Sequence, residues 1–357
     1  MTVSSAPGKV YLFGEHAVVY GEPAIPCAVE RRATVTADPR DDDHIRVEAA
    51  DLSLDGFTVE YGGPTDDAPD VDVPTPLLRA AMGYVDAAVE QARDAVGDES
   101  VGFDITVESD IPLGAGLGSS AAVVVAGIDA ATRACGVDLP PEEIAERAYR
   151  AEHQVQDGQA SRADTFCSAM GGAVRVEGDD CRTIDAPELP FVVGFDGGAG
   201  DTGELVAGVR KLREEYDFAA DTVTAIGDVV RTGEALLADA DPDDPPSDEL
   251  LAELGGLLNF DHGLLEALGV SSRSLDAMVW SAREAGAHGA KLTGAGGGGC
   301  IVALDPTDAT ETALRYTPDC DDVFRAELAT EGVRAEGDGT TGDDAPAGAE
   351  SSEGAEE

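Results

Sequence analysis

The chain has 357 residues, enough for two domains with a sizeable core, and an ordinary apolar fraction of 43%. Its 72 acidic and 23 basic residues give a formal net charge of −49, which repels nucleic acid and anionic lipid, so we expect neither as a partner. A charge this large makes most sense where concentrated salt screens it, as in the cytoplasm of a halophile. The longest uncharged run, residues 111–128, is half glycine-rich loop, which argues against a membrane span.

The chain begins with an apolar stretch, residues 5–21, whose pattern predicts a strand, a turn and a second strand. Lys9, Glu15 and His16 are embedded in it, where polar side chains must be paired or functional because unpaired burial is costly. The whole chain has only three lysines, so we interpret Lys9 as a site residue rather than a surface lysine. For His16, a hydrogen-bonded core histidine and a site residue fit about equally well.

The next segment predicts strands joined by solvated loops, because residues 37–76 combine Asp, Pro and Gly with short β-like pieces at 44–49 and 57–61. Apolar residues at helical spacing then predict a helix over residues 75–96. Phe103, Ile105 and Val107 alternate with polar residues, which predicts a strand with one buried face.

A glycine-rich loop followed by a predicted helix over residues 119–135 is the feature around which the chain is organised. Its three glycines lack the Cβ atoms that block close approach, so several backbone N–H groups can point at one anion at the positive end of the helix. The pattern matches neither the dinucleotide fingerprint nor the ordinary P-loop, and a tight turn without a ligand is the alternative. Three glycines and two serines exceed what such a turn needs, so we favour phosphate binding. This phosphate loop comprises Pro112, Leu113, Gly114, Ala115, Gly116, Leu117, Gly118, Ser119 and Ser120.

After a predicted helix that runs to about residue 156, Asp164 lies among small and apolar residues. A carboxylate in such surroundings needs hydrogen-bond partners to stay charged, which makes Asp164 a candidate site residue. A helix cap or an Asx-turn would satisfy it as well, and the sequence leaves both interpretations open.

The second half of the chain predicts a strand at 189–195 and four helices at 203–216, 221–238, 247–268 and 271–285. Residues 294–299 form another glycine-rich loop, but a strand follows it, so we expect a close approach to a ligand or to another backbone rather than a dinucleotide site. From Ala335 the tail is acidic and has no apolar period, which predicts disorder over residues 335–357.

Three glycine-bearing motifs in this order, with Lys9 before them and Asp164 between the second and third, resemble the GHMP kinases. The resemblance runs from about residue 3 to 330 and is closest to the family members that phosphorylate mevalonate, at residues 7–21, 112–122, 160–165 and 291–300. Galactokinases share the start up to Gly14-Glu15-His16 but continue with a Thr-Asp pair, where this chain has Ala17 and Val18.

The resemblance implies a two-domain α/β fold of α+β character, with ATP in the cleft. A β-α domain of the ribosomal-protein type would occupy residues 1–185, and a ferredoxin-like domain residues 186–334. By the same resemblance, the phosphate loop wraps the ATP phosphates, and Ser120 and Glu152 hold Mg²⁺. Asp164 would face the substrate hydroxyl with Lys9 beside it, and the further substrate contacts would be Glu15, His16 and Gly296.

The implied reaction is ATP-dependent phosphorylation of the 5-hydroxyl of (R)-mevalonate, in which Asp164 accepts or orients the alcohol proton and Lys9 stabilises charge. Lys9 and Asp164 should then pair when no substrate is bound. The nearest alternative is a kinase for another small alcohol, such as a mevalonate derivative or a sugar. A non-catalytic nucleotide-binding regulator on the same fold and a purely structural acidic protein are more distant alternatives. The oligomeric state is left open by the sequence, a homodimer included.

Overall fold

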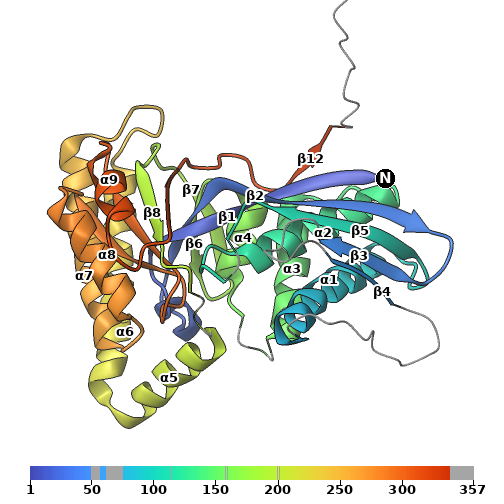
Figure 1. The fold of residues 1–357 in the computed structure, drawn as a ribbon, viewed down its shortest axis with the longest axis horizontal. Helices are drawn as coiled ribbons and strands as arrows, with labels where there is room; N and C mark the ends of the chain where they lie inside the picture. The colour runs from blue at the N-terminus through green and yellow to red at the C-terminus, as the bar shows by residue number, and fades with distance from the viewer. Residues whose placement is uncertain are drawn as a thin grey trace, which may run out of the picture.

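The computed structural model describes residues 1–49, 57–61, 75–112, 114–156, 158, 160–198, 200 and 202–337. Their helices and strands form two parts that lie side by side in Figure 1. The larger part is built on an eight-stranded sheet and the smaller part on a four-stranded sheet.

Two long antiparallel strands, β1 (Thr2–Phe13) and β2 (Ile25–Arg40), form the centre of the larger sheet. Beyond β2, the sheet continues through β5 (Gly102–Ser109), β3 (Ile45–Ala49) and β4 (Phe57–Tyr61), with β3 parallel to β5. A hairpin of β6 (Ala173–Glu177) and β7 (Asp180–Ile184) pairs with β2, and β12 (Arg334–Glu336) pairs with β1.

Four helices belong to this larger part: α1 (Thr75–Val96), α2 (Ser119–Ala134), α3 (Pro141–Val155) and α4 (Arg162–Met170). The alanine- and valine-rich α2 packs on β1 and β2, and α1 and α3 pack on α2. Small side chains allow this close packing, and α2 is buried over most of its length.

The smaller sheet is antiparallel, in the order β11-β8-β10-β9, and consists of β8 (Phe191–Phe195), β9 (Gly289–Thr293), β10 (Cys300–Leu304) and β11 (Asp322–Ala326). Four helices connect β8 to β9: α5 (Thr202–Glu215), α6 (Asp217–Ala238), α7 (Asp248–Ala267) and α8 (Arg273–Glu284). A ninth, α9 (Ala309–Arg315), connects β10 to β11, which gives the β-α-β-β-α-β connectivity of a ferredoxin-like unit.

One apolar core runs through both parts of the molecule, because its largest cluster includes Phe13 and Ile25 as well as Leu254 and Val302. The end of β1 reaches the helices of the smaller part: a Cβ added at Gly233 of α6 would lie 2.4 Å from the Phe13 ring. The end of β1 is therefore where the two parts meet, and this end carries the candidate site.

Two sequence predictions differ from the observed fold. The second strand expected before residue 21 is a short 3-10 helix, η1 (Ala17–Tyr20), because Gly14 (φ 101°) and His16 (φ 59°) adopt left-handed backbone conformations between it and β1. The tail expected to be disordered from Ala335 instead begins with β12, in which Ala335 and Glu336 pair with Ser4 and Val3. Backbone pairing at a sheet edge needs no apolar pattern, and residues 338–357 of that tail lie outside the described residues.

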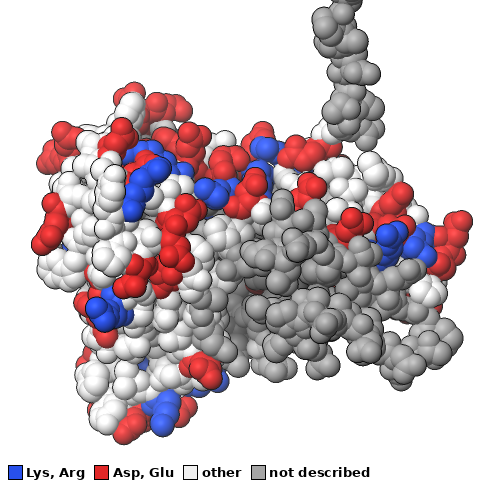
Figure 2. Space-filling view, viewed as in Figure 1, with Lys and Arg blue, Asp and Glu red and all other residues white. Residues whose placement is uncertain are grey.

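On the face seen in Figure 2, acidic side chains occur on both parts of the molecule and outnumber the Lys and Arg side chains, which lie in smaller groups among them. Within the described ranges, none of the helices combines the length and the apolar character needed to cross a membrane.

Candidate active site

The phosphate loop precedes α2 and lies against β1 and the second glycine-rich loop. Lys9 N–H donates to the Leu117 carbonyl at 2.8 Å, which ties the loop to β1. Gly116 (φ 80°) is required because a Cβ there would lie 2.9 Å from the Thr293 carbonyl oxygen, and Gly118 (φ 74°) is the N-cap of α2. Leu113, predicted as part of the loop, lies outside the described residues.

The Ser119 hydroxyl stands at the first turn of α2, and its oxygen is buried without a hydrogen-bond partner in the described structure. Buried hydroxyls are normally hydrogen-bonded, so an orphan at the positive end of a helix is suited to a ligand. The geometry therefore favours the phosphate-binding interpretation over a tight turn without a ligand.

Lys9 and Asp164 come together beside this loop, although 155 positions separate them in the chain. The Lys9 ammonium lies 3.4 Å from Asp164 Oδ2 and donates to the Gly116 carbonyl at 2.8 Å. Lys9 is 2% exposed, whereas the Asp164 side chain is 30% exposed. The pair expected from the sequence is thus confirmed, and its carboxylate has an open side.

Asp164 occupies the first turn of α4, but it does not cap the helix. Ser161 is the N-cap, and its hydroxyl accepts a hydrogen bond from Ala163 N–H at 3.4 Å. The capping alternative for Asp164 is therefore wrong, because Ser161 already fills that position.

Ser120 and Glu152, the predicted metal ligands, also meet. Ser120 Oγ donates to Glu152 Oε1 at 3.0 Å, from the first turn of α2 to the last turn of α3. Burial, with the charge of Asp164 as the second cause, raises the pKa of Glu152 to about 8. A buried carboxyl with too little positive charge around it, next to a hydroxyl, is an oxygen donor set that fits Mg²⁺.

Glu15 lies in a buried ion cluster with Lys291 of β9 and Asp261 of α7. Lys291 Nζ donates to Glu15 Oε1 and to the Leu292 carbonyl, and it lies 3.6 Å from Asp261 Oδ2. Burial is the main reason why the pKa of Glu15 rises to about 7 and that of Asp261 to about 6. In this cluster the Glu15 carboxylate is bound to Lys291. The predicted contact of Glu15 with substrate stays a prediction.

His16 combines a strained backbone with a half-satisfied ring. Nε2 lies 2.8 Å from the Ala295 carbonyl, which requires a proton on Nε2, and Nδ1 is buried without a partner. Burial lowers the pKa of His16, so the ring is neutral and Nδ1 is left as an acceptor. His16 thus has one structural hydrogen bond and one buried acceptor without a partner, and its predicted contact with substrate stays a prediction.

Gly296, the last predicted substrate contact, is surrounded by backbone. A Cβ at this position would lie 2.0 Å from the Val270 carbonyl oxygen, and one at Gly200 would lie 2.0 Å from the Gly296 carbonyl oxygen. Close backbone approach therefore explains this glycine without a ligand, and its predicted role in substrate binding stays a prediction.

Comparisons with known proteins agree on one family. The model of the GHMP kinase N-terminal domain matches residues 83–172, that of the GHMP kinase C-terminal domain matches residues 248–317, and the galactokinase galactose-binding signature matches residues 2–39. A mevalonate kinase of Thermococcus gammatolerans is 41% identical over 337 residues, which cover 94% of this chain and 98% of that protein. The chain belongs to the GHMP kinase family. It is therefore an enzyme of the kinase class.

Further relatives agree with this assignment. A mevalonate kinase of Pyrococcus horikoshii is 44% identical over 313 residues, 87% of this chain and 90% of that one. The crystal structure of the Methanococcus jannaschii mevalonate kinase superposes with a TM-score of 0.73 at 27% identity, covering 91% of this chain and 98% of that chain. The predicted two-domain α/β GHMP kinase fold is confirmed.

A second group of potential metal ligands in this kinase, His262, Glu266 and Asp276 on α7 and α8, has ligand atoms within 4.8 Å of one another. His262 Nδ1 accepts the N–H of Leu292 at 3.3 Å, so a neutral ring carries its proton on Nε2, which lies 3.5 Å from Asp276 Oδ1. The ring then offers no free lone pair, and the group is better described as a hydrogen-bonded pair beside an acid than as a metal centre.

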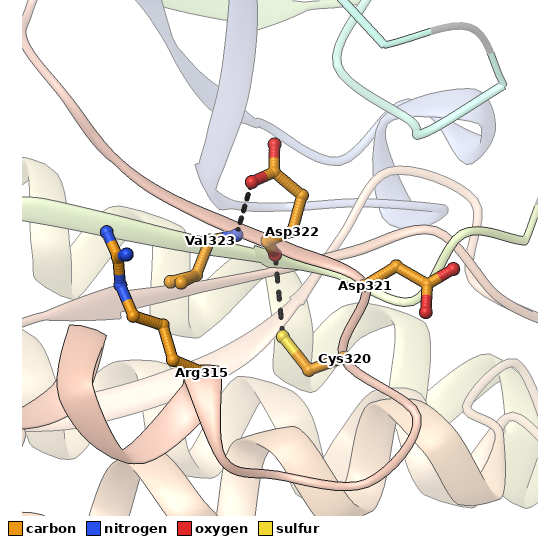
Figure 3. A pocket seen from close by; sticks show the side chains of 5 residues that line it. All are labelled: Arg315, Cys320, Asp321, Asp322 and Val323. Atoms are coloured by element: carbon orange, nitrogen blue, oxygen red, sulfur yellow. Dashed lines mark hydrogen bonds between the residues drawn. The ribbon is translucent and has the colours of Figure 1, made fainter.

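A hollow of about 200 Å³ lies elsewhere, at the start of β11 (Figure 3). Arg315, Cys320, Asp321, Asp322 and Val323 line it, and the Asp322 carboxylate is held by the N–H of Val323 at 2.8 Å. Two carboxylates against one guanidinium make this an unfavourable place for phosphates, and none of the predicted site residues lines it.

Two residues were missed from the sequence, Tyr11 of the candidate site and Asp261 of the buried ion cluster. Tyr11 lies on the same face of β1 as Lys9, because side chains two positions apart on a strand point to the same side. The strand period could therefore have indicated it. Asp261 is an acidic residue in an apolar helical run, which was the same signal that marked Lys9. The partners of these two residues do not follow from spacing. Asp164, the partner of Tyr11, lies on another element far along the chain, and Lys291, the partner of Asp261, lies on another element, β9.

Proposed function

We propose that this GHMP kinase transfers the γ-phosphoryl group of ATP to the 5-hydroxyl of (R)-mevalonate, giving 5-phosphomevalonate, the first kinase step of isoprenoid precursor synthesis. The similarity to mevalonate kinases over nearly the whole chain supports this substrate. The single observation that carries the chemistry is the Lys9–Asp164 pair, 3.4 Å apart, beside a glycine loop at the start of a helix.

Phosphoryl transfer needs in-line positioning and neutralisation of charge more than covalent help. The backbone N–H groups of the phosphate loop and the positive end of α2 receive the ATP phosphates. The Lys9 ammonium, held by the Gly116 carbonyl at the edge of that loop, stabilises charge that develops between alcohol and phosphate. Asp164 accepts or orients the proton of the alcohol from its exposed side.

Ser120 and Glu152 are the residues that would hold Mg²⁺. Bound there, Mg²⁺ would supply neutralisation of charge on the phosphates, and Glu152 would serve as a ligand in its ionised form. Two observations support this assignment: the raised pKa of the buried Glu152 and the hydrogen bond that the Ser120 hydroxyl donates to it.

Transfer to a sugar is the alternative that a specific observation favours, since the galactokinase signature matches residues 2–39. The residues after His16 weigh against it. Ala17 and Val18 are buried apolar residues of η1 and offer no side-chain hydrogen bond to a sugar hydroxyl. We therefore keep mevalonate as the substrate.

The test of the mechanism is Asp164→Asn, which keeps the shape of the side chain and removes its charge and basicity. We expect kcat to fall by about 10²–10⁴-fold, as loss of a general base does, with ATP affinity within about threefold. Single-turnover kinetics in molar KCl and nucleotide titration measure the two quantities. Near-normal turnover would remove Asp164 from the mechanism.

The test of the substrate is ADP release with a panel of alcohols at saturating ATP, in molar KCl. (R)-mevalonate should give the highest kcat/KM, above phosphomevalonate, homoserine and galactose. A higher value for another alcohol would replace the substrate while leaving the kinase assignment intact.

We further propose that the enzyme works in a salt-rich cytoplasm and binds neither nucleic acid nor anionic membrane, because of its net charge of −49. Raising KCl from millimolar to molar should then raise the melting temperature steeply, since the acidic surface repels itself at low salt. An unchanged melting temperature would contradict the proposed salt-rich setting.

The oligomeric state is a separate question, and light scattering in the same buffers distinguishes a homodimer from a monomer.

A further inference from the structure

Tyr11 lies where three segments of the chain meet. It follows Lys9 by two positions on β1, pairs with Pro26 of β2, and donates its backbone N–H to the Thr293 hydroxyl at 2.8 Å. Tyr11 is 6% exposed, and the close packing around it leaves its side chain little freedom to move.

The side chain of Tyr11 contacts both members of the proposed catalytic pair. Its hydroxyl donates to Asp164 Oδ1 at 2.8 Å, and the Lys9 ammonium lies 4.2 Å from the centre of its ring. Burial foremost, and then the charge of Asp164, raises the pKa of Tyr11 well above its ordinary value. The hydroxyl therefore keeps its proton at any working pH and acts as a donor.

The two oxygens of Asp164 consequently have different partners. Oδ1 accepts from Tyr11, and Oδ2 is the one that lies near Lys9. A carboxylate at the start of a short helix with a partly exposed side chain otherwise rotates between two nearly equivalent orientations. A hydrogen bond to a charged acceptor is among the stronger ones in proteins, strong enough to select one of them.

Building on the proposed function, we propose that Tyr11 is the positioning residue of the phosphoryl transfer: its hydroxyl fixes Asp164 Oδ1, so that Oδ2 is presented to the substrate alcohol, while its ring supports the Lys9 ammonium. The Tyr11 side chain makes polar contacts with Asp164 and Lys9. It acts through Asp164, and its contribution should vanish when Asp164 can no longer serve as the base.

A purely structural tyrosine would also need a partner for its buried hydroxyl, so geometry alone does not separate the two roles. Coupling does. A structural defect lowers activity by the same factor whatever residue stands at position 164, whereas a positioning defect is felt only when the base is present.

The experiment is a double-mutant cycle in molar KCl with Tyr11→Phe, Asp164→Asn and both together. Phe keeps the ring under Lys9 and removes the donor. We expect Tyr11→Phe to lower kcat about 10-fold in the parent, as expected for a lost hydrogen bond to a charged group, with KM for ATP within about twofold. In the Asp164→Asn background the same substitution should change kcat less than about twofold.

Tyr20→Phe is the matched control. Tyr20 also donates its hydroxyl, to the Val206 carbonyl at 3.3 Å, and has a cation, Arg213, over its ring at 3.9 Å, but it has no part in the proposed mechanism. It should leave kcat within about twofold. Circular dichroism melts set a temperature at which every variant is folded.

An equal loss in both backgrounds, or an unchanged kcat in Tyr11→Phe, would overturn the positioning role. These outcomes are distinct from a failure of the proposed function, which near-normal turnover of Asp164→Asn alone would reveal.

Discussion

Lys9 and Lys291 are both buried, in a chain with only three lysines, yet their surroundings differ. Lys291 is 0% exposed and has two carboxylates, Glu15 and Asp261, and the Leu292 carbonyl around its ammonium. Lys9 has one carboxylate, which is 30% exposed, one carbonyl of the phosphate loop, and the ring of Tyr11.

The difference shows that burial alone does not identify a site lysine. Lys291 is fully compensated inside the core, and its two carboxylates share one positive charge, so one of them takes up a proton near neutral pH. Lys9 shares its partner with the open side of the site. We therefore assign Lys291 to stability and Lys9 to catalysis, and the predictions below test that division.

The largest effect on stability is expected for Lys291→Met. It leaves Glu15 and Asp261 buried without a cation, and breaking a buried ion cluster in this way costs about 3–5 kcal/mol of unfolding free energy. Urea unfolding in molar KCl measures it. Lys211→Met is the control, because Lys211 is exposed on α5 and its loss should stay within about 0.5 kcal/mol. Equal stability of the two variants would remove the structural role of Lys291.

Lys9→Met should act mainly on rate. Removing an electrostatic stabiliser of the transition state lowers kcat by about 10²–10³-fold. Asp164 is partly exposed and can be solvated by water, so the stability loss should be smaller than that of Lys291→Met. Turnover and urea unfolding on the same preparations give both numbers. The division fails if Lys9→Met is the less stable of the two variants.

If Glu152 holds Mg²⁺ as proposed, Glu152→Gln should weaken Mg²⁺ activation by about 10-fold or more, because a charged oxygen donor is lost. With the Glu152 pKa near 8, the parent should need less Mg²⁺ as pH rises from about 6 to 8, because the ion binds the ionised carboxylate. Titration of activity with Mg²⁺ at several pH values measures both effects. Glu142→Gln, an exposed change at the start of the same helix, should leave the titration unchanged, and a flat pH response of the parent would exclude Glu152 as the ligand.

The smallest effect is expected for Asp261→Asn, and it depends on pH. The raised pKa of Asp261, about 6 in the folded protein, means that the folded state holds this proton more tightly than the unfolded state. This contribution to the free energy of unfolding is fully present below the ordinary pKa of Asp, and it is lost as pH rises through about 6.

Asn removes that loss and leaves Glu15 and Lys291 as a one-to-one pair. The variant should therefore gain stability relative to the parent as pH rises from about 4 to about 6, on the order of 1 kcal/mol, and keep that gain at higher pH. Melting temperatures over this range test it, with Glu253→Gln on the exposed side of α7 as the control. A difference that does not change with pH would show that Asp261 is ionised throughout.

Much of the candidate site could be predicted from the sequence, because its signals are local. Glycines at alternate positions before a helix predict the loop whatever the rest of the chain does. A lysine in a chain nearly without lysines, inside an apolar strand, predicts a buried and paired ammonium. The helices followed from apolar spacing in the same way, and α1 was found at residues 75–96 as expected.

Pairing across the chain was decided only by the tertiary structure. Lys291 meets Glu15 and Asp261, and Tyr11 meets Asp164, through contacts between strands and helices that no spacing encodes. The short β12 likewise exists because an edge of β1 was available to it. Sequence determines which groups need a partner, since desolvation acts on each residue alone, but the choice of partner depends on which surfaces the packed core brings within a few ångströms.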